Sequence, residues 1–139
     1  MALARKWRVP AEQIVYDMAG IGRSFGSYLA GHGLRGASGY FGAGRGGRRY
    51  VNRRTANAFA LRRRLDPHRD GFVPFYCGGI PEWPTLRHEL AELHAPAMEI
   101  QESETRQLLE PKEALTARLH RSPDLLDALL MTFTYLEEG

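Results

Sequence analysis

Apolar and polar residues alternate in short blocks along the chain, and the blocks predict short strands interleaved with helices. Residues 12–16 contain a run of apolar and β-prone side chains, which predicts a buried strand. Asp17 and a glycine-containing turn follow this strand directly. The large apolar residues of 22–31 lie on one side of a predicted helix that glycines end. The first half is therefore predicted to contain a helix over 2–8, strands over 12–16 and 34–41, helices over 22–31 and 50–65, and a basic loop over 42–49.

The second half begins with a segment, 66–85, that is rich in proline and glycine and predicts turns with one short edge strand over 72–76. The last predicted element is the clearest. Ser122 and Pro123 have the pattern of an N-cap followed by a first-turn proline, and leucines then recur at helical spacing through residue 136. The other predicted elements are helices over 85–93 and 111–120 and strands over 97–101 and 106–110, joined by a polar hairpin loop.

This alternation of strands and helices is typical of α/β proteins, and we expect one domain over 1–139 with a mixed sheet. With 139 residues, 43% of them hydrophobic, the chain has enough apolar surface to bury, which excludes a disordered chain. The single cysteine, Cys77, excludes a disulfide scaffold. Apolar runs stay well below the roughly 20 residues that span a bilayer, so no membrane association is expected.

The net charge of +3 conceals two halves of opposite sign. Residues 1–65 hold 13 lysines and arginines and two acidic residues, whereas residues 66–139 hold 6 lysines and arginines and 14 acidic residues. Ten arginines and no acid lie between Asp17 and Asp66. The guanidinium fork matches the geometry of a phosphate, so this block predicts contact with phosphate or nucleic acid. The alternative is a solvated basic face that the acidic half balances.

Two aspartates stand in the first turn of the last predicted helix. Asp124 and Asp127 are three residues apart and so share a helix face. Acids in a first turn interact favourably with the helix macrodipole, so capping is the alternative explanation, above all for Asp124. Capping explains Asp127 less well, because apolar neighbours place it partly inward. Clustered carboxylates are the ligands that Mg²⁺ or Mn²⁺ prefers.

Asp17 is a third candidate ligand, because it directly follows a predicted strand, and ligands of open α/β sheets bind at the carboxyl ends of strands. A role in a turn or a helix cap is the alternative. Together with Asp124 and Asp127 it would form an acidic cluster of the kind that holds two divalent cations during phosphodiester hydrolysis. The nearby arginines would hold the nucleic-acid backbone.

At these residues the chain resembles the nuclease domain of phage terminase large subunits. The segment IVYDMAGIGRSFGSYL (14–29) is similar to the strand, acid and Gly-x-Gly turn of that domain, and GLRGASGYFGAGR (33–45) to its next strand. YVNRRTANAFALRRRL (50–65) resembles its Tyr-x-Asn-x-Arg helix. PTLRHELAEL (84–93) and LLEPKEALTARLHRSPDLLDALLMTF (108–133) resemble its closing segments. The likeness runs in order over about 120 residues.

The resemblance implies an RNase H-like mixed sheet flanked by helices and an endonuclease that cuts DNA during packaging with two Mg²⁺ or Mn²⁺ ions. It implies that Asp17, Asp124 and Asp127 bind metal, and that Lys112 has a phosphate-contacting or active-site-adjacent role. For Lys112, an ordinary helix-surface lysine is the alternative. The implied partners are double-stranded DNA and, at the packaging motor in the bacterial cytoplasm, the terminase ATPase domain, the small terminase subunit and the portal.

The chain departs from the family pattern because no aspartate-bearing strand precedes residues 12–16, and the phosphate loop of the ATPase domain is missing: GAGRGG (42–47) lacks its Lys-Ser/Thr. We therefore expect a nuclease domain truncated at its N-terminus, from a truncated prophage gene, a split gene or a fragment, with weak or absent activity alone. The main hypothesis is a terminase nuclease domain whose backbone-contacting patch is Arg45, Arg48, Arg49, Arg53 and Arg54. The alternatives are a non-catalytic DNA-binding or motor-interaction remnant and a junction-resolvase-like enzyme.

Overall fold

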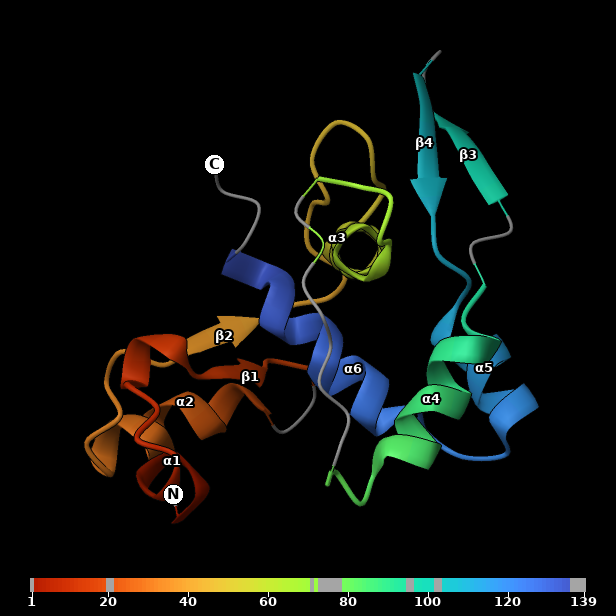
Figure 1. The fold of residues 1–139 in the computed structure, drawn as a ribbon. Helices are drawn as coiled ribbons and strands as arrows, with labels where there is room; N and C mark the ends of the chain where they lie inside the picture. Colours follow the sequence, from red (N-terminus) through yellow and green to blue (C-terminus); the bar gives the residue numbers. More distant parts are fainter. Residues whose placement is uncertain are drawn as a thin grey trace. The chain divides into compact units, whose positions relative to one another are not determined.

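The computed structural model describes residues 2–19, 22–70, 72, 79–94, 97–101 and 104–135. It is a mixed α/β fold (Figure 1) that divides into two compact units, unit 1 (Met1–Gly42) and unit 2 (Ala43–Gly139). Among the described helices, none is long and apolar enough to cross a membrane. Cys77 and the predicted strand positions 73–76 lie outside the described residues.

Unit 1 is built on a pair of short parallel strands with a helix between them in sequence. Tyr16 of the first strand pairs with Gly39 of the second. Gly26 allows the helix to approach closely, since a Cβ there would lie 2.2 Å from the Tyr16 hydroxyl oxygen. The helix over 22–31 is confirmed, and both strands are shorter than predicted. The elements are α1 (Ala2–Lys6), η1 (Ala11–Gln13), β1 (Val15–Asp17), α2 (Gly22–Gly31) and β2 (Ser38–Tyr40).

Unit 2 contains four helices and a hairpin in its described part. The hairpin strands pair antiparallel from Ala97 opposite Leu108 to Gln101 opposite Glu104, so the predicted hairpin is confirmed with its second strand starting two residues early. The elements are α3 (Arg53–Leu65), α4 (Trp83–Glu92), β3 (Ala97–Gln101), β4 (Glu104–Leu108), α5 (Lys112–Leu119), α6 (Asp124–Met131) and the 3₁₀ turn η2 (Thr132–Tyr135).

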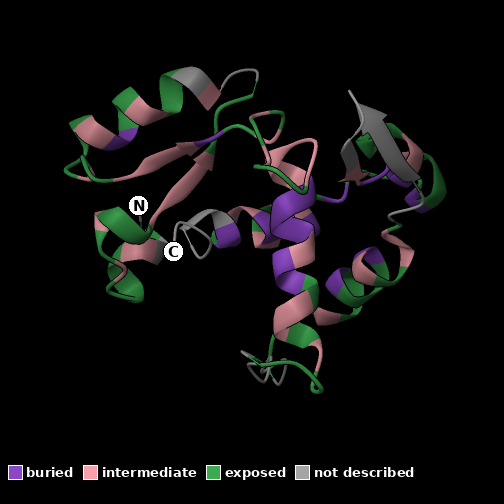
Figure 2. Cartoon of the chain, turned by 90° about the horizontal axis from the view of Figure 1, so that it is seen from above, coloured by how far each residue is buried: buried purple, intermediate pink, exposed green. Residues whose placement is uncertain are grey.

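The core of unit 2 lies where α3, α4, α5 and α6 meet, and buried residues gather on these helices (Figure 2). Leu115 and Leu126 are fully buried, and Leu130 is 1% exposed. The buried amide of Asn57 on α3 donates to the Leu130 backbone oxygen over 2.8 Å, which fastens α3 to the end of α6. The buried cluster comprises Ala58, Ala60, Leu61, Leu86, Leu109, Leu115, Leu119, Leu126, Leu130 and Phe133.

The starts of α3 and α6 differ from expectation for reasons that their N-caps show. Helix α3 begins at Arg53, not at 50, because Asn52 is its N-cap: the Asn52 Oδ1 atom accepts a hydrogen bond from the Thr55 N–H at 2.9 Å. The prediction of Ser122 as the N-cap of the last helix is wrong by one residue. Pro123 occupies that position without a side-chain cap, and Ser122 instead donates its hydroxyl to the Asp124 carboxylate.

Candidate functional site

The Asp127 carboxylate on α6 lies within ion-pair distance of two cations from other helices. Its Oδ2 atom is 2.5 Å from Lys112 Nζ on α5, and its Oδ1 atom is 3.7 Å from Arg54 Nε on α3. The Asp127 side chain is 24% exposed and that of Lys112 is 44% exposed, so the pair opens to solvent on the lysine side. We call these three residues the Asp127 cluster. It joins three helices through three candidate site residues: Asp127 and Lys112, which are 15 positions apart in the sequence, and Arg54 of the predicted arginine patch.

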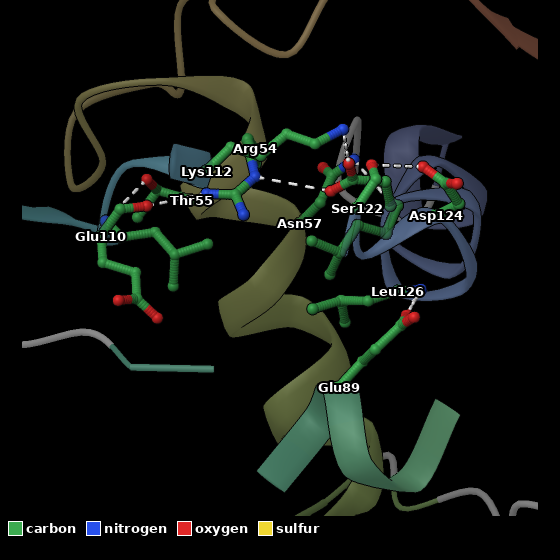
Figure 3. Close-up of polar contacts among 12 residues, drawn as sticks. Arg54, Thr55, Asn57, Glu89, Glu110, Lys112, Ser122, Asp124 and Leu126 are labelled. Atoms are coloured by element: carbon green, nitrogen blue, oxygen red, sulfur yellow. Dashed lines mark hydrogen bonds and ion pairs between the residues drawn. The ribbon is translucent and has the colours of Figure 1, made fainter. Parts of the chain in front are cut away.

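Arg54 belongs to this cluster more than to an open surface. Its side chain is only 16% exposed, and Nη1 donates to the Glu110 backbone oxygen over 2.9 Å (Figure 3). The start of α3 is fixed nearby, because the Thr55 hydroxyl accepts the Leu109 N–H at 3.0 Å. These bonds hold α3 against the segment that follows β4, which is why the Arg54 guanidinium points inward.

The other two candidate acids have local partners. Asp124 is exposed at the start of α6 and accepts the Ser122 hydroxyl (Figure 3). Asp17 is exposed at the carboxyl end of β1 in unit 1, where its Oδ1 atom accepts the Ala19 N–H at 2.9 Å. This hydrogen bond gives Asp17 the role in a turn that was the alternative to metal binding.

The predicted divalent-cation site can be compared with the Asp127 cluster. Such an ion takes several oxygen ligands. Asp127, however, already has its charge balanced by Lys112 and Arg54, and a cation would compete with both. Among the residues that the structure describes, no three His, Cys, Asp or Glu side chains gather as a metal site.

The segment before α3 carries the other predicted basic residues. Arg45, Arg48 and Arg49 are exposed, and Arg53 is half-buried. The backbone of this segment closes into a loop. Arg45 and Asn52 form an isolated antiparallel β-bridge, and the Arg53 N–H donates to the Gly44 oxygen at 2.7 Å. The exposed guanidinium groups therefore stand on a closed loop at the N-terminal end of α3.

The sequence interpretation missed two acidic residues with well-defined partners. Glu89 on α4 is fully buried, pairs with Arg121, and accepts the Leu126 N–H at 2.6 Å, so it caps α6 from another helix (Figure 3). The sequence does contain a signal for the burial of Glu89, because this residue lies on the apolar face of α4, between Leu86 and Leu90. A glutamate on a buried face needs a partner, which predicts a buried ion pair or cap.

Glu110, just after β4, is the second missed residue. Burial raises its pKa, but hydrogen bonds from the Arg118 guanidinium and the His94 backbone N–H outweigh this effect, so the pKa of Glu110 lies below its ordinary value. Arg118 donates to both Glu110 oxygens, at 2.8 and 2.5 Å, and His94 N lies 2.9 Å from Oε1. Glu110 thereby fastens α5 to the segment between α4 and the hairpin.

The chain matches no protein-family model, no curated protein and no solved structure. What it does must therefore be inferred from its own residues. Unit 2 supplies two chemically distinct features for that purpose: the charge-balanced Asp127 cluster and the exposed arginines that precede α3.

Proposed function

We propose that this protein binds DNA in the manner of the nuclease domain of a phage terminase large subunit, with an RNase H-like fold, and that its own hydrolytic activity is weak or absent. The observation that carries the proposal is the acid-free, arginine-rich stretch between Asp17 and Asp66, whose Arg45, Arg48 and Arg49 are exposed. Exposed guanidinium forks bind phosphates in a bidentate manner. The ordered motifs of the sequence support the choice of family.

The Asp127 cluster supports the second part of this proposal. A carboxylate that is paired with Lys112 and Arg54 is poorly available to a metal ion. Lys112 is nearly half exposed, so its ammonium group can meet a phosphate that approaches from solvent. The same resemblance supports a packaging motor in the bacterial cytoplasm as the setting, with the ATPase domain, the small terminase subunit and the portal as protein partners.

We expect the triple change Arg48→Ala/Arg49→Ala/Arg53→Ala to weaken binding to a 20-base-pair duplex and to flatten its salt dependence. Each lost phosphate contact reduces the slope of log K against log salt concentration by about 0.9. Fluorescence anisotropy with a labelled duplex, from about 50 to 200 mM NaCl, measures both quantities.

The control is Arg87→Ala, which removes an exposed arginine from α4, in the acidic half of the chain. It should leave the slope unchanged. A triple variant with the wild-type slope would show that these arginines do not contact the backbone of DNA.

Metal-dependent hydrolysis of DNA is the second candidate function, and the position of Asp17 favours it. This residue lies exposed at the carboxyl end of one of two parallel strands, where α/β proteins place their ligands. Asp17 and Asp127 are then the residues whose loss should matter most for cleavage.

Nicking of supercoiled plasmid DNA with Mn²⁺ separates the two candidates. We expect the wild-type chain to bind the plasmid and to leave it uncut or nearly so. Cleavage that Asp17→Ala abolishes, while DNA affinity stays the same, would overturn this expectation and establish the enzyme. Asp66→Ala is the matched control, since Asp66 is paired with Arg69 and lies outside the candidate acids.

A further inference from the structure

Unit 2 has a hollow of about 430 Å³ that includes Arg49 but otherwise lies outside the features above. Its size falls in the range of small-ligand pockets, which is about 300–1,000 Å³. It shares no described residue with the Asp127 cluster. Four arginines, two aromatic residues and one amide line it: Arg49, Arg62, Arg63, Arg69, Tyr50, Phe59 and Gln107.

Backbone pairing brings the walls of the hollow together. The Val51 N–H donates to the Gln107 oxygen at 3.1 Å, and the Gln107 N–H donates to the Arg49 oxygen at 2.9 Å. The segment before α3 thus lies alongside β4, which sets Tyr50 beside the hairpin. Tyr50 stacks on Phe59 of α3 with ring centroids 5.2 Å apart and an interplanar angle of 28°.

The hollow is strongly positive. Of the described residues that line it, none is acidic, and one neighbouring acid, Asp66, balances Arg69 at 3.2 Å. Arg63 donates to the Tyr50 hydroxyl over 3.1 Å, which orients its guanidinium beside the ring. Arg49 and Arg62 are exposed at the rim. Cationic forks therefore stand beside aromatic rings in one concave site.

We propose that this hollow holds one unpaired nucleotide of a DNA strand, with the base against the Tyr50 and Phe59 rings and the phosphate on the arginines. Bases stack on aromatic side chains independently of sequence, and guanidinium groups match phosphate. A paired base cannot offer its face to a ring, so the site selects single strands or frayed ends. The inference rests on the proposed DNA binding and adds a second, strand-selective contact to it.

An acidic peptide would need the arginines alone, whereas a nucleotide also uses the two rings. The test therefore separates the contribution of charge to the affinity from the contribution of base stacking. Fluorescence anisotropy is measured with labelled dT12, with an abasic 12-mer of equal charge, and with a duplex. The variants are Arg62→Ala and Phe59→Leu, with Arg87→Ala as the control for the loss of an exposed arginine.

We expect the wild-type chain to bind dT12 about fivefold or more tightly than the abasic strand. Phe59→Leu should remove that difference, and Arg62→Ala should weaken the binding of both strands. All variants should bind the duplex as the wild type does, provided that their circular dichroism spectra are unchanged. Tyr50→Phe keeps the ring and removes the hydroxyl, so it should retain the preference for dT12 even if Phe59→Leu proves unstable.

Equal affinity for dT12 and the abasic strand would show that no base stacks on the two rings. Displacement of dT12 by a hexaglutamate peptide at equal charge concentration would show the same. If duplex binding persists while Arg62→Ala binds dT12 normally, this inference is wrong and the proposed function stands. Loss of binding to all three DNA probes in the wild type would overturn both.

Discussion

Replacing Glu89 with alanine is expected to lower the free energy of unfolding of unit 2 by about 2–4 kcal/mol. The change removes a fully buried carboxylate that caps the Leu126 N–H, so a buried donor on α6 loses its acceptor and a cavity opens beside α4. Arg121 loses its partner as well, but it is 40% exposed and can be hydrated, so its share of the loss is small. Urea denaturation followed by circular dichroism measures the difference.

Two further variants separate the cap from the charge. Glu89→Gln keeps an oxygen for the Leu126 N–H and removes the ion pair, so it should cost less than half as much as alanine. Glu92→Ala, in the last turn of the same helix, removes an exposed ion pair with Arg118 and should cost less than about 1 kcal/mol. A Glu89→Ala chain as stable as the wild type would show that the buried carboxylate has no net stabilising role.

Glu110 is expected to make unit 2 sensitive to acid, and Glu110→Gln should remove this part of the sensitivity. Because the pKa of Glu110 lies below its ordinary value of 4.5 in the folded chain, the unfolded chain takes up the proton first as the pH falls. The stabilisation by Glu110 is therefore complete above about pH 5 and is lost as the pH falls through the lower folded pKa. At pH 7 the variant should lose about 2–3 kcal/mol, the contribution of hydrogen bonds to a charged group.

The decisive measurement is the difference in free energy of unfolding between the wild type and Glu110→Gln as a function of pH. It should be constant above about pH 5 and should shrink below the ordinary pKa. Glu113→Gln, at an exposed position on α5, serves as the control and should stay close to the wild type throughout. A difference that does not change with pH would show that the Glu110 carboxylate gains nothing from folding in its charged form.

Local signals in the sequence predicted most of the elements. The helix over 22–31 has its predicted bounds because glycines end it, and the hairpin follows from alternation around a polar loop. Helix α3 was predicted three residues too long at its start, since an asparagine that caps a helix also fits within a helical pattern. Ser122 was predicted one residue too early as the cap of the last helix: Pro123 is the N-cap, and the N–H of Leu126, the third helical residue, has its acceptor on α4.

The candidate site was less predictable, because its partners are distant in sequence. Local pattern marked Asp127 and the family resemblance marked Lys112, but their ion pair depends on where the start of α5 lies relative to α6. Arg54 was grouped with the surface arginines because its neighbours are basic; the Glu110 oxygen that it contacts is 56 residues away. The hollow beside Tyr50 was not predicted at all, because it requires β4 to lie against the segment before α3.

The uneven distribution of buried side chains between the two units has a consequence for their motions. In the described part of unit 1 only Leu29 and Tyr40 are buried apolar residues, and its strands are three residues long, whereas unit 2 has a continuous core. Segments with few buried contacts open at low free-energy cost. Amide protons of unit 1, those around Asp17 included, should therefore exchange with solvent long before those of α3 and α6, and Asp17 stands on the part of the chain that opens most often.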